Sequence, residues 1–154
     1  MSMTPEQSAR QFSELLETSL GAHQKGDLEV AATGYQAILD RFPNHAVTLD
    51  LYGTLLHQRG DVGKALELLE RAVATAPELV SARLHLGGVR LAINDPEHAL
   101  EEFQAVCAAD TGNAEGWLGQ AQVLDRLNRL EEAIAAARRA VDILPTHAVT
   151  LGRL

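Results

Sequence analysis

A repeat of fixed length is the feature that most constrains what this chain can fold into. Its clearest column is a set of alanines spaced 34 residues apart: Ala31, Ala65, Ala99 and Ala133. Small residues recur at the same spacing in a second column: Ser19, Gly53, Gly87 and Ala121. A fixed period of this length indicates that one supersecondary unit is repeated along the chain. A stack of short units has no single deep active site by default, so function becomes a question about surfaces.

The turns between helices follow the same period. Glycine occupies the turn position in the first two units and asparagine in the last two: Gly26, Gly60, Asn94 and Asn128. Both residue types tolerate the left-handed backbone conformation that ends a helix. Between the turns, apolar residues recur three and four positions apart, which is the period of an α-helix. The sequence therefore predicts eight antiparallel helices, no strands and an all-α fold.

The first helix has a start signal of its own. Thr4 is predicted to be its N-cap, Pro5 its first residue and Gln7 the partner that completes a capping box. We expect this helix to run to about Lys25. The alanines of the first column are expected to be buried where two helices cross, because a larger side chain there would separate the helices.

The composition argues against several classes of function. Apolar residues make up 46% of the chain but aromatic residues only 4%, so an aliphatic core is expected. The formal net charge of -8 argues against a nucleic-acid partner, which requires clustered lysine and arginine. The single cysteine, Cys107, is interpreted as a small buried hydrophobe. No phosphate loop, paired carboxylates or nucleophile–base motif is visible in the sequence, so we expect no enzyme activity, cofactor or metal.

Membrane insertion and secretion are not expected either. The start of the chain lacks an apolar signal segment, and no apolar run approaches the length that spans a membrane. One cysteine provides no disulfide framework, so a reducing cytoplasm is the expected location.

The residues in these columns resemble the tetratricopeptide repeat family. That family has a bulky and a small residue in the first helix of each unit, glycine at the turn, alanine and then an aromatic residue in the second helix, and a closing proline. The matching residues are Gly26, Ala31, Tyr35 and Pro43 in the first unit; Tyr52, Gly53, Gly60, Ala65 and Pro77 in the second; Leu86, Gly87, Ala99 and Phe103 in the third; and Trp117, Ala121, Ala133 and Pro145 in the fourth.

The resemblance implies an α-solenoid of four helix-turn-helix units, wound as a right-handed superhelix. It implies one domain over residues 1–154, with repeats at about 12–45, 46–79, 80–113 and 114–147 and a truncated fifth repeat at 148–154. The first helices of the repeats would line a concave groove, and such grooves bind peptides or helices of partner proteins.

The resemblance also implies which side chains face that groove. They are Leu16, Leu20 and His23 in the first repeat; Asp50, Thr54, His57 and Gln58 in the second; Leu84, His85, Gly88 and Leu91 in the third; and Leu118 and Gln122 in the fourth. Exposed leucines at these positions favour an apolar partner segment, helical or extended. Gly88 and Gly119 are expected to leave the groove floor open to a partner. The alternative is that these leucines pack against neighbouring helices.

Two binding modes of the family are not expected here. Chaperone-binding members resemble one another in a lysine and asparagine clamp for a C-terminal carboxylate, but Leu16 and Leu20 occupy those positions. Members of the O-linked sugar transferase kind carry an asparagine ladder along the groove. The ladder positions in this chain hold Glu17, Leu51, His85 and Gly119.

Two pairs of polar residues have alternative interpretations. His23 and His57 occupy equivalent positions one repeat apart, either as ordinary polar groove residues or as a pair that senses pH or binds a metal. Arg83 and Arg90 replace the apolar residues that the family usually has. They either anchor an acidic group of a partner or pair with nearby acids of the chain, namely Glu67, Glu70 or Glu101.

The end of the sequence predicts an uncovered apolar face. The last full helix, expected at about Leu130 to Ile143, carries an apolar stripe formed by Ile134, Ala137, Val141 and Leu144. A fifth repeat begins after Pro145 but is too short to cover that stripe. We therefore expect a weak homodimer through this end.

Three functions follow as expectations. The first is a non-catalytic module that binds a protein or peptide partner. The second is the substrate-recruiting N-terminal part of a bacterial multidomain transferase of the glycosyltransferase or sulfotransferase type. The third is a self-associating assembly scaffold.

Overall fold

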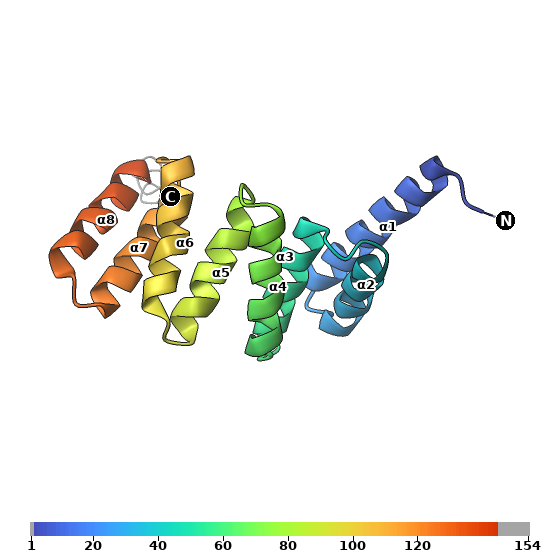
Figure 1. The fold of residues 1–154 in the computed structure, drawn as a ribbon, viewed down its shortest axis with the longest axis horizontal. Coiled ribbons are helices and arrows are strands. Elements are labelled where there is room, and N and C mark those ends of the chain that lie inside the picture. Colours follow the sequence, from blue (N-terminus) through green and yellow to red (C-terminus); the bar gives the residue numbers. More distant parts are fainter. Residues whose placement is uncertain (1, 145–154) are drawn as a thin grey trace, which may run out of the picture. The chain divides into compact units, whose positions relative to one another are not determined.

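The computed structural model describes residues 2–144, and within them the chain is entirely helical apart from its turns (Figure 1). The predicted all-α fold is confirmed, and no strand occurs in this part of the chain. The expected fifth repeat at 148–154 lies outside the described residues. The helices are α1 (Pro5–Gln24), α2 (Leu28–Arg41), α3 (Ala46–Gln58), α4 (Val62–Thr75), α5 (Val80–Ala92), α6 (Pro96–Ala109), α7 (Ala114–Arg126) and α8 (Leu130–Ile143).

The chain divides into two compact units, Met1–Leu79 and Val80–Leu154. In the first unit α1 packs against α2, α3 packs against α4, and α2 bridges to α3. The second unit has the same arrangement: α5 packs against α6, α7 against α8, and α6 against α7. Within each unit, therefore, one helix pair covers the apolar face that the next pair would otherwise expose.

The start of α1 follows the prediction. The Thr4 side chain accepts a hydrogen bond from the Gln7 backbone N–H at 3.2 Å, and the Gln7 side chain accepts one from the Thr4 N–H at 2.9 Å. This reciprocal pair is the predicted capping box, and Pro5 is the first residue of the helix. The helix ends at Gln24, with Lys25 as its C-cap.

All of the predicted turn residues adopt the left-handed backbone conformation. The φ angles are 82° at Gly26, 85° at Gly60, 62° at Asn94 and 60° at Asn128. The residue after each turn donates its N–H to a carbonyl five residues earlier, as Asp27 does to Ala22 at 2.9 Å. This bond satisfies a carbonyl that the helix end would otherwise leave unpaired. The glycine and asparagine column therefore sets where every first helix stops.

The alanine column lies at the helix crossings, as predicted. Ala31, Ala65 and Ala99 are fully buried, and Ala133 is 8% exposed. The small residues of the second column also allow close approach of two helices. A Cβ atom at Gly53 would lie 2.8 Å from Leu69 Cγ, so the backbone of α3 approaches α4 more closely than any larger residue allows.

The side chain of Phe103 joins the two helix pairs of the second unit. Its ring lies between two glycines: a Cβ at Gly87 of α5 would lie 2.8 Å from Phe103 Cζ, and a Cβ at Gly119 of α7 would lie 2.5 Å from Phe103 Cδ1. Phe103 itself is buried and belongs to α6. One large side chain therefore fills the space that two missing side chains leave.

Candidate functional site

The predicted groove leucines of the first unit are half-buried on α1. Leu16 packs against a core cluster that includes Ala31, Tyr35 and Leu55. Leu20, one helical turn later, is also half-buried. Leu16 therefore packs against neighbouring helices, which was the alternative to an exposed position in the groove.

His23 connects the first repeat to the second. Its Nδ1 lies 3.1 Å from the Tyr35 hydroxyl, and its Nε2 lies 2.9 Å from Gln58 Oε1. Because the amide oxygen of Gln58 only accepts, Nε2 carries the proton and Nδ1 accepts from the tyrosine hydroxyl. Burial raises the pKa of Tyr35 to about 12, so this hydroxyl keeps its proton.

The interpretation of His23 and His57 as a metal pair finds no support in this geometry. Both ring nitrogens of His23 are already engaged by Tyr35 and Gln58. Among the described residues, no group of three or more histidine, cysteine or acidic side chains is arranged to hold a metal ion. His23 and Gln58, predicted as groove residues, therefore bind each other across the repeat boundary.

The remaining predicted positions of the first unit lie on α3. Asp50 was predicted to face the groove, but it is only 3% exposed, so its side chain is buried. Thr54 is half-buried, and its hydroxyl donates to the Asp50 carbonyl at 2.9 Å. His57 is half-buried, and Gln58 is exposed apart from its contact with His23.

In the second unit the predicted groove residues belong to α5 and α7. Leu84 and Leu91 are half-buried and pack against the cluster around Phe103. Leu118 is 42% exposed, and Gln122 is exposed one turn further along α7. The remaining predicted residue of α5, His85, is half-buried. We call the set of predicted groove positions Leu84, Gly88, Leu91, Leu118 and Gln122 the α5–α7 face.

The two glycines predicted to open the groove floor have different surroundings. A Cβ at Gly88 would meet no atom within 4 Å, so the backbone is open there, as expected. The prediction for Gly119 is wrong, because this residue is buried under the ring of Phe103. The small residue at 119 serves the packing of α6 on α7 and leaves no space for a partner.

Arg83 and Arg90 share a carboxylate of their own unit. Arg83 Nη1 lies 2.8 Å from Glu102 Oε2, and Arg90 Nη1 lies 3.8 Å from Glu102 Oε1. The side chain of Glu102 is 11% exposed, so these charges are largely withdrawn from water. Glu102 was not among the acids predicted as partners, although it adjoins the predicted Glu101. The observed geometry favours the structural interpretation of both arginines.

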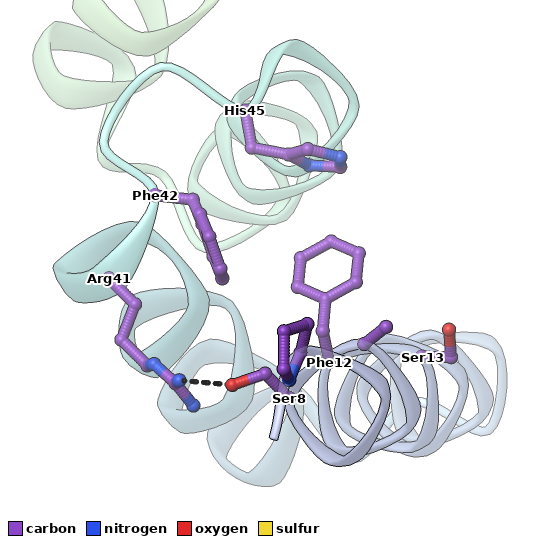
Figure 2. Close-up of a pocket in the computed structure, with 8 residues that line it drawn as sticks. Ser8, Phe12, Ser13, Arg41, Phe42 and His45 are labelled. Atoms are coloured by element: carbon purple, nitrogen blue, oxygen red, sulfur yellow. Dashed lines mark hydrogen bonds between the residues drawn. The ribbon is translucent and has the colours of Figure 1, made fainter. Parts of the chain in front are cut away.

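A pocket near the start of α1 was not foreseen from the sequence (Figure 2). Its volume is about 690 Å³, and its lining residues are Pro5, Ser8, Ala9, Phe12, Ser13, Arg41, Phe42 and His45. The ring of Phe12 meets the ring of Phe42 edge-to-face at a centroid distance of 5.3 Å, and meets the ring of His45 at 5.0 Å. Phe12 is far from the other two rings in sequence, so no local signal indicated that the three would meet.

His45 also caps α3. Its Nδ1 accepts from the Thr48 N–H at 3.3 Å and lies 2.8 Å from the Thr48 hydroxyl. Burial lowers the pKa of His45, so the ring is neutral at pH 7 and its proton sits on Nε2.

Cys107 is buried, as predicted, with 4% of its surface exposed. Burial raises the pKa of its thiol, which keeps the thiol protonated and unreactive. The Sγ atom is close to α7, since a Cβ at Gly116 would lie 2.8 Å from it.

The apolar stripe on the last helix is present. Leu130, Ile134, Val141 and Leu144 are between 38% and 63% exposed, and Ala137 is half-buried.

In the described part of the chain, every helix is too short or too polar to cross a bilayer.

Comparison with known proteins identifies the repeat. The sequence profile of the tetratricopeptide repeat matches three overlapping stretches, residues 16–80, 51–114 and 86–148. The protein bimA of Emericella nidulans is 27% identical over 130 residues, which cover 84% of this chain and 16% of bimA. The chain therefore spans only a small part of the length of that relative.

Solved structures show the same fold. MamA superposes with a TM-score of 0.80 at 23% identity over 89% of this chain and 75% of MamA. MamA from Desulfovibrio magneticus superposes with a TM-score of 0.78 at 24% identity over 94% of this chain and 78% of that one. An O-GlcNAc transferase of Thermobaculum terrenum gives a TM-score of 0.75 at 26% identity, over 90% of this chain but 27% of the transferase. The profile matches, the helix pairs and the turn residues agree, and the chain belongs to the tetratricopeptide repeat family.

Proposed function

We propose that this chain is a non-catalytic module that binds a helical or extended apolar segment of a partner protein, with the α5–α7 face of the second unit as the main contact surface. The tetratricopeptide repeat is a protein–protein interaction module, and the proposal adds the chemistry of the partner. The observation that carries it is the α5–α7 face, where exposed Leu118 accompanies open backbone at Gly88. An apolar side chain of a partner finds there both an apolar contact and room for close approach.

The other proposed contacts lie on the same unit and, separately, on the first unit. On the α5–α7 face, Leu84 and Leu91 offer the exposed part of side chains whose remainder packs on the core. In the first unit, Leu20 and His57 are half-buried and provide apolar and polar contacts on α1 and α3. Substitution of Leu84 or Leu91 would disturb the core as well as the surface, so neither leucine is the best test.

A sharper test uses Gly88 and Leu118. Gly88→Arg and Leu118→Asp each place a charge on the α5–α7 face without entering the core. Gly63→Arg is the matched control, because Gly63 also lies in a helix and a Cβ there would likewise meet no atom within 4 Å. Proteins captured from extracts of cells that naturally contain this chain are quantified by mass spectrometry for each variant.

The expected result is a set of partners retained by the parent and by Gly63→Arg but lost by both substitutions on the α5–α7 face. Circular dichroism checks that the helical content is unchanged. Equal capture by all variants would move the binding site to another surface and refute the proposal.

A second candidate function is favoured by one comparison. This chain matches 27% of an O-GlcNAc transferase chain at 26% identity, which is consistent with a substrate-recruiting region placed beside a catalytic domain. We propose as the alternative that the chain is the substrate-recruiting N-terminal domain of a bacterial multidomain transferase of the glycosyltransferase or sulfotransferase type. The full reading frame that encodes the chain tests it, since an adjacent transferase domain is required.

The stripe on α8 supports a third candidate, a scaffold that self-associates weakly. Ile134 and Val141 are 53% and 63% exposed, and a second copy would cover them. Light scattering at increasing concentration should show a dimer that Val141→Glu abolishes. A monomer at every concentration would exclude this candidate.

A further inference from the structure

The pocket at the start of α1 exists because this helix is longer than its counterparts. Helix α1 has 20 residues, whereas α3, α5 and α7 have 13 each. Figure 1 shows α1 extending beyond the end of α2. The additional turns carry Pro5, Ser8 and Ala9 past the turn between α2 and α3, which supplies Phe42 and His45. The repeat pattern alone would not create this pocket.

The walls of the pocket are aromatic. Figure 2 shows the ring of Phe12 directed toward Phe42 and His45, and the edge-to-face contacts hold the three rings at interplanar angles of 85° and 75°. Phe42 is 43% exposed although it is a large hydrophobic residue. Rings that are fixed by one another and still open to water form a ready apolar surface for a side chain of a ligand.

The polar groups of the pocket are hydrogen-bond donors or neutral hydroxyls. Arg41 is the charged side chain among the lining residues, and no carboxylate lines the pocket within the described part of the chain. Arg41 donates to Gln11 Oε1 at 3.2 Å and to Ser8 Oγ at 3.4 Å, both neutral acceptors. Since Nδ1 of His45 accepts from Thr48, its Nε2–H is a further donor.

This local charge differs from the charge of the whole molecule. The chain has a formal net charge of -8, so its average field repels acidic ligands. The position of Arg41 in the last turn of α2 favours a cation and explains its presence in part. A cation–π contact with the Phe42 ring, at 5.8 Å from Arg41 Cζ to the ring centroid, accounts for its place beside the aromatic wall, but no residue lining the pocket supplies a carboxylate to its charge. A ligand that supplies both an apolar group and a carboxylate is complementary to the pocket.

We propose that this pocket binds a peptide segment of a partner protein in which a bulky apolar side chain is followed directly by an acidic residue. The apolar side chain packs against Phe12 and Phe42, and the carboxylate pairs with Arg41. Pro5, Ala9 and Ser13 of α1 line the pocket and are exposed, so a peptide bound there can continue into solvent. This site shares no residue with the α5–α7 face, so the two proposals are tested independently.

The experiment uses eight-residue peptides with blocked ends, labelled with a fluorophore and followed by fluorescence anisotropy. The test peptide has a central Phe-Asp pair, and its two counterparts have Phe-Asn and Ala-Asp in the same place. A fourth peptide ends in Phe with a free carboxylate, so that a terminal acid can be distinguished from a side-chain acid. We expect the Phe-Asp peptide to bind more tightly than all three.

The protein variants localise the binding. Arg41→Gln should weaken binding of the Phe-Asp peptide by about two- to fivefold, the range for losing an exposed ion pair. Arg59→Gln is the matched control in the same unit, because Arg59 pairs with Glu29 on the surface instead of bordering the pocket. Ala9→Trp fills the pocket from its exposed rim and should abolish binding while circular dichroism shows an unchanged fold.

Amide chemical shifts in ¹⁵N-labelled protein give the location directly. Shifts confined to Ser8, Phe12, Phe42 and His45 on addition of the Phe-Asp peptide would support the proposal. Shifts on the α5–α7 face, equal affinity for Phe-Asp and Phe-Asn, tighter binding of the free carboxylate, or no binding of the Phe-Asp peptide would each overturn it. The same shifts caused by protein concentration alone would assign the pocket to a second copy of the chain and overturn it as well.

Discussion

Gly87 and Gly88 are adjacent in α5 but have opposite surroundings, so alanine at each position separates packing from helix propensity. A Cβ at Gly87 would lie 2.8 Å from Phe103 Cζ and 2.9 Å from Cε1, whereas a Cβ at Gly88 would meet nothing within 4 Å. The ring cannot simply move away, because a Cβ at Gly119 on its other side would lie within 2.5 Å of it. Relief therefore requires α5 or α7 to shift.

The magnitudes follow from these distances. Replacement of a helical glycine by alanine stabilises a helix by about 0.5–1 kcal/mol, and this gain is common to both positions. Overpacking in a filled core costs about 1–3 kcal/mol and applies only to Gly87→Ala. We expect Gly88→Ala to be slightly more stable than the parent. Gly87→Ala should be less stable than Gly88→Ala by this overpacking cost. Each kcal/mol of the cost lowers the melting temperature by about 2–4 °C.

Urea unfolding followed by the fluorescence of Trp117 is the appropriate assay. Trp117 is the chain's single tryptophan and packs against the cluster around Phe103, so it reports on the same unit. Gly87→Ala should cost less in a Phe103→Leu background than in the parent, because the smaller side chain makes room for the added Cβ. The reasoning is refuted if Gly87→Ala is as stable as Gly88→Ala, or if Gly87→Ala costs the same with Leu as with Phe at position 103.

Three further predictions concern the repeat columns and the caps. Ala65→Leu and Ala99→Leu should each destabilise by about 1–3 kcal/mol in thermal melts because both alanines are fully buried at crossings; unchanged melts would mean that the crossings lie elsewhere. Asn94→Ala should cost about 1 kcal/mol and Asn94→Gly almost nothing, because the φ of 62° is left-handed, and equal costs would contradict this. Burial lowers the pKa of His45, so the stability from its neutral cap is present above the unfolded value of about 6.5 and is lost as pH falls through the folded pKa. His45→Asn keeps a cap but should make the urea midpoint depend less on pH between about pH 5 and pH 7.5. An unchanged pH dependence would exclude His45 as its source.

The helix pairs were predictable because their determinants are local. The left-handed turns at Gly26 and Asn94 depend on one residue type and its neighbours in sequence, and the capping box at Thr4 needs only four residues. The alanine column follows from the same period, since each repeat places it at an equivalent crossing. These features therefore need no knowledge of tertiary contacts.

The surface was less predictable because it depends on neighbours from other helices. Gly119 occupies a groove position in its own repeat, but the ring of Phe103 from the preceding helix covers it. Leu84 and Leu91 were predicted to face a partner, but both pack on the core. The position of a residue within its repeat predicts the direction in which its side chain leaves the helix. It does not predict whether a side chain from the adjacent helix pair already fills the space on that side.

The pocket at α1 could not be predicted for a related reason. Phe12 marks the start of the first repeat, and the residues before it lie outside the repeat pattern. The contact of Phe12 with Phe42 and His45 requires the length of α1, the end of α2 and the turn to α3 to be known together. A pattern repeated four times carries no information about the segment that has no counterpart.

Phe103 also limits how this chain can be recombined. By sequence it belongs to the third repeat, but its ring rests on Gly119 of the fourth as well as on Gly87 of its own. A chimera joined between the third and fourth repeats would separate this ring from one of its two glycines. An incoming repeat with alanine at position 119 would press on the ring, and an incoming leucine at position 103 would leave a void beside it. Grafts that preserve the native junction must therefore transfer Gly87, Phe103 and Gly119 as a set.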